Sequence, residues 1–129
     1  MRRAERLIEQ AKKAMPELAS RLDTDLALIE PDDTDDDSGW VAYHAYGGVV
    51  FDFLRDALHA NQIEEARRVF ALAEELAASG ETYAQSVVTT EIAYQLVAAG
   101  LNAQARTLMG PATLELLRSQ EEMFGSGMN

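Results

Sequence analysis

The spacing of apolar residues is the feature that most constrains the fold of this chain. Apolar side chains recur every three or four positions along most of its 129 residues, which places them on one face of an α-helix. Residues 49–59 are the clearest case, because Val50, Leu54 and Leu58 fall on one arc and Asp52 on the opposite one. The hexapeptide at residues 25–30, DLALIE, is short enough to be either a strand or an extended segment.

Glycine and proline divide the helical segments from one another. Pro16 opens a second helix after a first one, because proline fits the first turn of a helix but not its interior. Gly47-Gly48 predicts a kink or a break. Gly80 and Gly100 are placed to supply left-handed stops, and Gly110-Pro111 closes one helix and opens the last.

Capping patterns predict where three of the helices begin. Asn61 is followed three residues later by Glu64, and Thr82 by Gln85, and both spacings fit a capping box. Asn102 is placed to cap a shorter helix. We therefore expect these three residues to cap the helices that follow them.

The whole pattern predicts an all-α protein. Short capped turns make consecutive helices antiparallel, and the apolar residues of segment 83–99 point nearly all the way round, as in a central helix. We predict a compact bundle of about six helices in antiparallel hairpins, with a short α-solenoid as the alternative. We expect residues 1–129 to form a single domain with an acidic loop at 31–39 and a flexible tail at 125–129.

The charge is strongly negative and unevenly distributed. The net charge is −11, and residues 23–37 hold eight acidic and no basic side chains. Such a field repels nucleic acid and anionic membranes and attracts basic partners. The chain has no cysteine, and it has neither a signal-peptide pattern nor a stretch of membrane-spanning length. We expect a cytoplasmic protein that binds no nucleic acid and no membrane.

The sequence contains no recognisable catalytic or metal-binding motif. If a calcium loop began at Asp33, its sixth position would be Ser38 and its twelfth His44, where an EF-hand needs glycine and glutamate. His44 and His59 are too far apart along a helix to share a metal. No nucleophile elbow, phosphate loop or dinucleotide fingerprint is present. We therefore predict no enzyme activity, no cofactor and no metal site.

The candidate binding residues gather around the acidic loop. The acidic loop is either a solvated connector or a binding surface for a basic partner. A cluster of aromatic residues follows it. The candidate partner-binding residues are Asp32, Asp33, Asp35, Asp36 and Asp37 for charge, and Trp40, Tyr43 and Tyr46 as aromatic anchors.

Two glutamates lie within or beside apolar stripes. Glu91 is on the helix that is apolar on most sides, and Glu74 borders the stripe that contains Phe70. A buried carboxylate is costly unless it is paired or hydrogen-bonded, so both predict internal hydrogen bonds that fix helix packing. Arg67 is a possible partner of Glu74.

Several short motifs occur in a characteristic order. They are Met15-Pro16-Glu17-Leu18, Gly48 ahead of Phe51 and Phe53-Leu54, Glu74-Glu75-Leu76, Glu91, and Met109-Gly110-Pro111-Ala112-Thr113. This order resembles a family of small all-helical bacterial proteins of unknown function, similar to the immunity proteins of polymorphic and contact-dependent growth inhibition toxins. The resemblance implies an all-helical fold and a binding role.

These observations lead to one expected function and one alternative. We expect an immunity-like protein that neutralises a cognate basic toxin, such as a nuclease, by occluding its active-site cleft. The alternative is a helical adaptor or a self-associating scaffold subunit, which would form a homo-oligomer.

Overall fold

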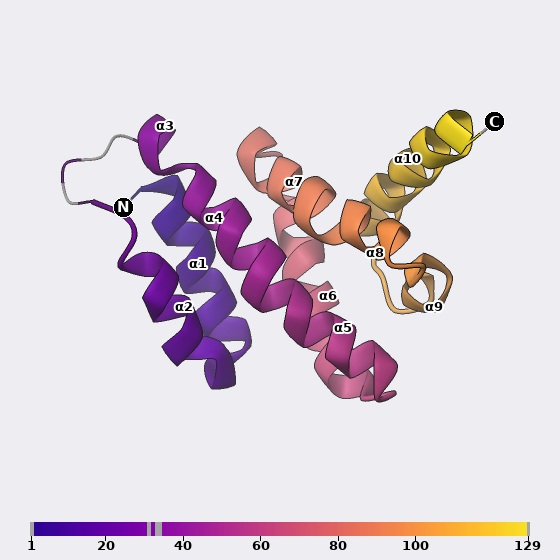
Figure 1. The fold of residues 1–129 in the computed structure, drawn as a ribbon, viewed down its shortest axis with the longest axis horizontal. Helices are drawn as coiled ribbons and strands as arrows, with labels where there is room; N and C mark the ends of the chain where they lie inside the picture. The colour runs from indigo at the N-terminus through magenta and orange to yellow at the C-terminus, as the bar shows by residue number, and fades with distance from the viewer. Residues whose placement is uncertain (1, 31, 33–34, 129) are drawn as a thin grey trace.

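The computed structural model describes residues 2–30, 32 and 35–128, without the side chains of residues 35, 36 and 125–128 (Figure 1). The described residues form an all-α bundle, as predicted, and contain no strand. In chain order the α-helices are α1 (Arg3–Ala14), α2 (Ala19–Leu26), α3 (Asp35–Ser38), α4 (Trp40–Ala45), α5 (Phe51–His59), α6 (Ile63–Ala77), α7 (Thr82–Val88), α8 (Tyr94–Ala98), α9 (Asn102–Arg106) and α10 (Pro111–Met128). A 3₁₀ turn, Pro16–Leu18, joins α1 to α2, and its opening proline was expected.

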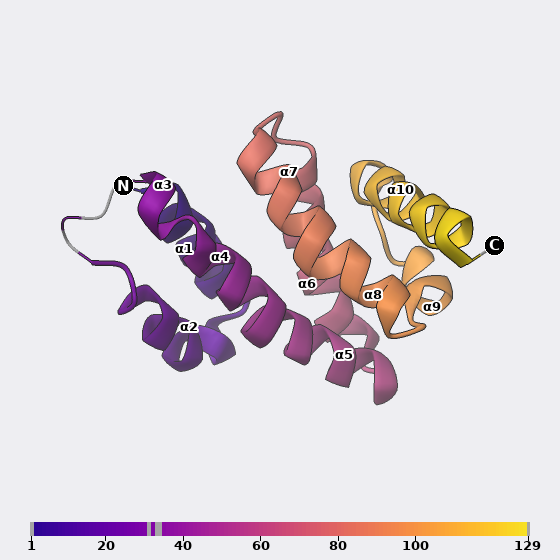
Figure 2. The same ribbon diagram turned by 45° about the horizontal axis from the view of Figure 1, so that its top comes forward.

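Two helices share the centre of the bundle. Helix α6 contacts α1, α5, α7 and α10, and its buried side chains include Val69, Phe70 and Ala73. The segment that was predicted to be central, α7 with α8, packs against α6 on one side and α10 on another. In both views the α4–α5 segment and the α7–α8 segment lie side by side and run in the same direction (Figures 1 and 2).

Of the kink or break predicted at Gly47-Gly48, the break is excluded, because the chain stays helical there. Residues Tyr46–Val50 form a π-helical turn that joins α4 to α5 into one helix over residues 40–59. A second π-helical turn, Thr89–Ala93, joins α7 to α8 in the same way. The two π-turns contact one another.

The spacing of the buried residues explains both π-turns. Residues 42, 46, 50, 54 and 58 are all buried, as are residues 84, 88, 92 and 96. An α-helix turns about 100° per residue, so a constant step of four residues moves the apolar stripe about 40° around the helix each time. One wider π-turn rotates the stripe back toward the core. Each long helix therefore contains one.

None of the three residues expected to cap a helix occupies the cap position. Asn61 has φ +57°, so it ends α5 in the left-handed region, and Gln62 precedes α6 without a side-chain cap. Glu81 takes the cap position before α7, and Thr82 is already helical. Asn102 is likewise the first residue of α9 and donates to Glu121 Oε2 at 2.6 Å. The stops at residues 80 and 100 are confirmed, with φ +78° and +74°.

Helical structure also extends into three segments where it was not predicted. Residues 25–30 contain no strand, because α2 continues to Leu26 and a turn follows. The acidic loop contains the short helix α3. Helix α10 reaches Met128, so the backbone is helical through most of the predicted tail.

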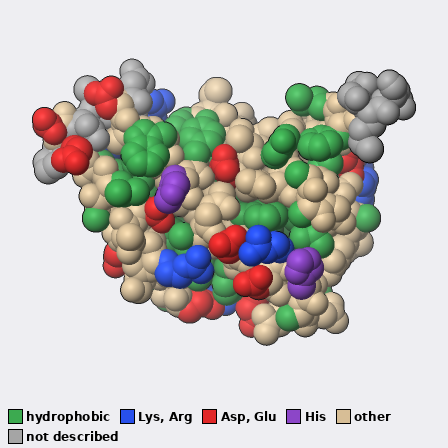
Figure 3. Space-filling view, in the orientation of Figure 1, with side chains coloured by type: hydrophobic (Ala, Val, Ile, Leu, Met, Phe, Trp, Pro, Cys, Tyr) green, Lys and Arg blue, Asp and Glu red, His purple; other side chains and the backbone are tan. Residues whose placement is uncertain are grey.

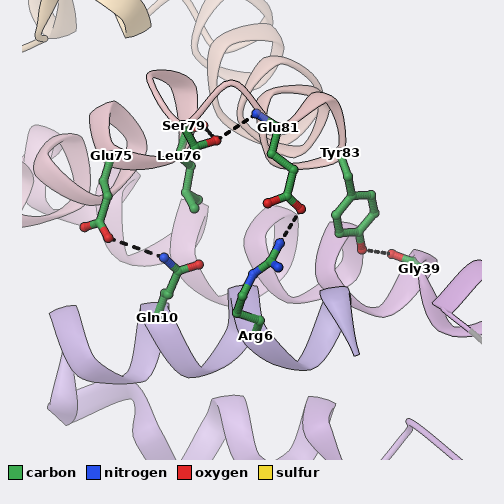
Figure 4. Close-up of polar contacts among 8 residues, drawn as sticks. All are labelled: Arg6, Gln10, Gly39, Glu75, Leu76, Ser79, Glu81 and Tyr83. Carbon is green, nitrogen blue, oxygen red and sulfur yellow. Dashed lines mark hydrogen bonds and ion pairs between the residues drawn. The ribbon is translucent and has the colours of Figure 1, made fainter. Parts of the chain in front are cut away.

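Polar contacts from the α6–α7 connection hold the N-terminal helix and the start of α4 in place (Figure 4). Arg6 of α1 forms an ion pair with Glu81, and Gln10 donates to Glu75 Oε1 at 3.3 Å. The Tyr83 hydroxyl donates to the backbone carbonyl of Gly39, just before α4. The first two contacts therefore join α1 to the α6–α7 segment, and the third joins the start of α4 to α7.

Candidate partner-binding face

The acidic segment lies directly ahead of α4. Asp33 falls outside the described residues, and the side chains of Asp35 and Asp36 are not described either. Asp32 and Asp37 are exposed. The structure therefore places part of the predicted charge next to the N-terminal end of α4, and the interface role of these residues stays a prediction.

Trp40 is a large exposed aromatic residue on α4. Its side chain is 53% exposed, and its ring meets the edge of the His44 ring at a centroid distance of 6.1 Å. Nδ1 of His44 lies 2.7 Å from Oδ1 of Asp25, a residue of α2 that is only 4% exposed. Asp25 thus orients His44, and His44 in turn supports one side of Trp40.

Tyr43 lies on the side of α4 that faces α7. Its hydroxyl donates to Ser86 Oγ at 2.9 Å, and its ring packs edge-on against Tyr83 at 5.9 Å. The ring is partly buried, so it joins the two helices and presents only part of its surface to solvent.

Tyr46 does not belong to this face, and its prediction as an aromatic anchor is wrong. Its side chain is 0% exposed, and its hydroxyl donates to the carbonyl of Leu7 at 2.6 Å. Burial raises the pKa of this phenol well above its ordinary value, so it remains a protonated donor. Its position in the four-residue spacing of buried residues explains why it points inward.

The two π-turns meet at Glu91. The Glu91 side chain lies against Gly47, because a Cβ atom built on Gly47 comes within 2.2 Å of Glu91 Oε1. Burial raises the pKa of the Glu91 carboxyl, and a side-chain hydrogen bond with Gln95 opposes that shift. This carboxylate therefore lies partly buried at the line where the two long helices touch.

Glu74 makes internal hydrogen bonds with the start of α10, and Arg67 is not its partner. Its carboxylate accepts from the backbone N–H of Ala112 at 3.1 Å, the backbone N–H of Thr113 at 2.9 Å and the Thr113 hydroxyl at 2.9 Å. Burial works against the charged form, but these three bonds outweigh it and lower the pKa of Glu74. Arg67 instead lies 3.8 Å from Glu64.

The outer surface of α4 and α7 forms one face, shown in Figure 3. Over these helices the view shows large hydrophobic side chains, with acidic side chains beyond them toward α3. We define the α4 face as Trp40, Tyr43 and His44 of α4, Gly48 of the π-turn that follows α4, and Glu91 of the π-turn that follows α7. Sequence reasoning did not identify the supporting residues Asp25 and Ser86, which lie far from their partners in sequence.

Other surface features of the described residues do not form a comparable site. A groove of about 440 Å³ between α1 and α6 is lined by residues that include Lys13, Arg68 and Glu75, but Arg68 is already paired with Glu17. The described part of the chain holds no group of three metal-ligating side chains. It also contains no helix of the length and apolarity needed to cross a membrane.

The chain is therefore an all-α protein with an exposed surface that carries aromatic and acidic side chains. The model of a protein family described as a domain of unknown function, DUF7674, matches residues 8–125. The chain belongs to this family. No curated protein and no solved structure matches the chain.

Proposed function

We propose that this protein is an immunity-like binding protein that neutralises a basic toxin, such as a nuclease, by covering its active-site cleft. The observation that carries the proposal is the exposed Trp40 beside the acidic segment, on a chain of net charge −11. Nuclease clefts are positive because they hold phosphates. An acidic partner is therefore attracted over long range and can occupy the same contacts.

Trp40 suits the role of a central anchor. Tryptophan is enriched among the residues that dominate binding energy, and an anchor works best when its conformation is fixed before binding. Here the contact with His44, which is itself held by Asp25, limits the freedom of the exposed ring. Carboxylates around it would supply the charge.

Co-expression tests this function most directly. The product of the reading frame adjacent to this gene is expressed alone and together with this chain. We expect growth arrest in the first case and normal growth in the second. A harmless neighbouring product, or toxicity that this chain does not relieve, argues against neutralisation of that product.

Neutralising the acidic segment should slow association with the toxin. The quintuple variant D32N/D33N/D35N/D36N/D37N loses the long-range attraction. We therefore expect its association rate constant with the toxin to be lower by about tenfold or more at low ionic strength. The rate should also depend less on salt, and the dissociation rate should change little. Stopped-flow measurement over a range of salt concentrations checks this.

A matched control separates local charge from total charge. It removes the same number of charges from exposed positions elsewhere on the chain, in the variant D56N/E64Q/E75Q/E115Q/E122Q. Equal slowing by the two variants would mean that only net charge matters, and the acidic segment would lose its special role.

A second candidate function has one specific observation in its favour. Tyr94 is 46% exposed and Met123 63% exposed, and the Tyr94 ring packs against that of Phe124 at 5.3 Å. An apolar patch of this kind on α8 and α10 also suits a self-associating scaffold subunit. A mass measurement in solution at micromolar concentration distinguishes the two candidates, because a stable homo-oligomer favours the scaffold.

A further inference from the structure

Gly48 is a helical glycine that the described part of this chain does not require. It is exposed, and it is not among the glycines with positive φ. A Cβ atom built on it meets no atom within 4 Å. Glycine weakens a helix relative to alanine, so a glycine here has a cost without a structural return. One physical reason for a missing side chain at an exposed helical position is the close approach of another molecule.

Glu91, which lies against the neighbouring Gly47, is a partly buried carboxylate with no cation paired to it among the described residues. No Lys or Arg of the described residues lies within ion-pair distance of it, and its hydrogen-bond partner is the neutral Gln95. Two other partly buried glutamates, Glu81 and Glu121, are paired with Arg6 and Arg106. The cost of partly burying the Glu91 charge is thus not offset by a cation of the described chain.

The two features are neighbours. Gly47 lies against the Glu91 carboxylate, and Gly48 is the next residue on the same π-turn. π-turns inside α-helices occur frequently at functional sites, and here two of them meet. Gly48 also follows Trp40 and His44 at four-residue steps, so the bare backbone lies on the exposed line of the α4 face.

We propose that Glu91 and the bare backbone at Gly47-Gly48 form the receptor for one basic side chain of the partner protein, whose backbone passes over Gly48. This inference rests on the proposed function and names the group that the α4 face recognises. An arginine side chain forms two parallel hydrogen bonds with a carboxylate, and arginine is common at such sites because of that geometry. A cation at this position also offsets the burial that raises the pKa of Glu91.

The receptor is tested with a small probe, acetyl-Gly-Arg-Gly-amide, titrated into the full chain and followed by amide NMR. We expect saturable shifts at Gly47, Gly48 and Glu91. The variant E91Q should weaken this binding about tenfold, because a charge-assisted pair becomes a neutral one. The control E122Q removes the same charge from an exposed position on α10 and should leave the affinity unchanged. Acetyl-Gly-Gln-Gly-amide should produce no saturable shift.

The variant G48A separates binding from folding. Alanine is a better helix former and meets no neighbour, so the melting temperature should equal or exceed that of the wild type. The probe, or the toxin, should nevertheless bind more weakly, because the new methyl group occupies the surface over which the ligand passes. A merely structural glycine would not show this combination of retained stability and weakened binding.

Three outcomes overturn the inference. Probe shifts confined to residues 32–37 and unchanged in E91Q would place the cation elsewhere, while neutralisation of a toxin could still hold. Full binding by G48A would show that nothing approaches that backbone closely. Shifts at Gly48 that appear on concentrating the protein without the probe, and vanish in E91Q, would identify a second copy of this chain as the occupant. Failure of toxin neutralisation alone would remove the proposed function and leave the receptor result intact.

Discussion

Replacing Glu74 by alanine should lower the free energy of unfolding by about 2 to 3 kcal/mol. The Glu74 carboxylate accepts three hydrogen bonds at the start of α10, two of them from backbone N–H groups that have no partner within a helix. Alanine removes all three acceptor contacts and leaves partly buried donors without partners. Chemical denaturation measures the loss, and the melting temperature should fall by roughly 10 °C.

The neighbouring Glu75 provides the control. It is exposed and accepts one 3.3 Å bond from Gln10. E75A removes the same charge from the adjacent position, and we expect it to cost less than about 0.5 kcal/mol. Equal losses for E74A and E75A would show that the contact between Glu74 and α10 does not stabilise the fold.

The effect of Glu74 should also depend on pH. The hydrogen bonds from Ala112 and Thr113 lower the pKa of Glu74 in the folded protein below the ordinary 4.5. A group with a lowered folded pKa stabilises the protein above its unfolded pKa, and this contribution is lost as the pH falls through the folded value. The difference in stability between wild type and E74Q should therefore be full at neutral pH and shrink below about pH 4.5. A difference that grows on acidification would contradict the role of the charged form.

The fold class was predictable because it depends on local spacing. Apolar residues three and four positions apart specify helices wherever they occur, and glycines such as Gly80 and Gly100 mark helix ends through a backbone conformation that other residues avoid. The capping boxes at Asn61 and Thr82 were misleading because each of these residues lies one position away from the true cap, which is Gln62 or Glu81.

The π-turns have a signal in the sequence, which is the spacing of the buried residues. Five buried positions from Ala42 to Leu58 follow one another at steps of four, which no straight α-helix keeps on one face. The same spacing includes Tyr46 and leaves out Trp40 and Tyr43. It therefore distinguishes the core tyrosine from the residues of the α4 face.

Tertiary partners were beyond sequence reasoning. The apolar surroundings of Glu74 predicted that it needs a partner, but its donors lie 38 and 39 residues away on another helix. The contact of His44 with Asp25 and the approach of Glu91 to Gly47 likewise depend on how the helices pack. A single sequence shows which groups need partners, whereas the packing decides which partners they find.

Replacing Gly110 by alanine should be nearly as damaging as removing Glu74. A Cβ atom built on Gly110 comes within 2.5 Å of Glu74 Cδ, 2.6 Å of Oε1 and 2.7 Å of Cγ. Gly110 does not have a positive φ, so the close approach and not the backbone conformation excludes a side chain. Alanine must push the Glu74 side chain away from α10. We expect a loss of about 2 kcal/mol, measured by chemical denaturation.

A double-mutant cycle identifies this mechanism. In the E74A background the obstructing side chain is gone, so G110A should cost nothing or stabilise slightly by restricting the unfolded chain. The coupling between the two changes should then be about 2 kcal/mol, whereas additive losses would mean that Gly110 acts independently of Glu74.

G47A is the informative comparison, because a Cβ atom built on Gly47 meets the end of the Glu91 side chain at 2.2 Å. That carboxylate has Gln95 as its hydrogen-bond partner and can swing away, so G47A should cost less than about 1 kcal/mol. A close glycine contact is therefore costly to fill only where the facing side chain is held by bonds of its own.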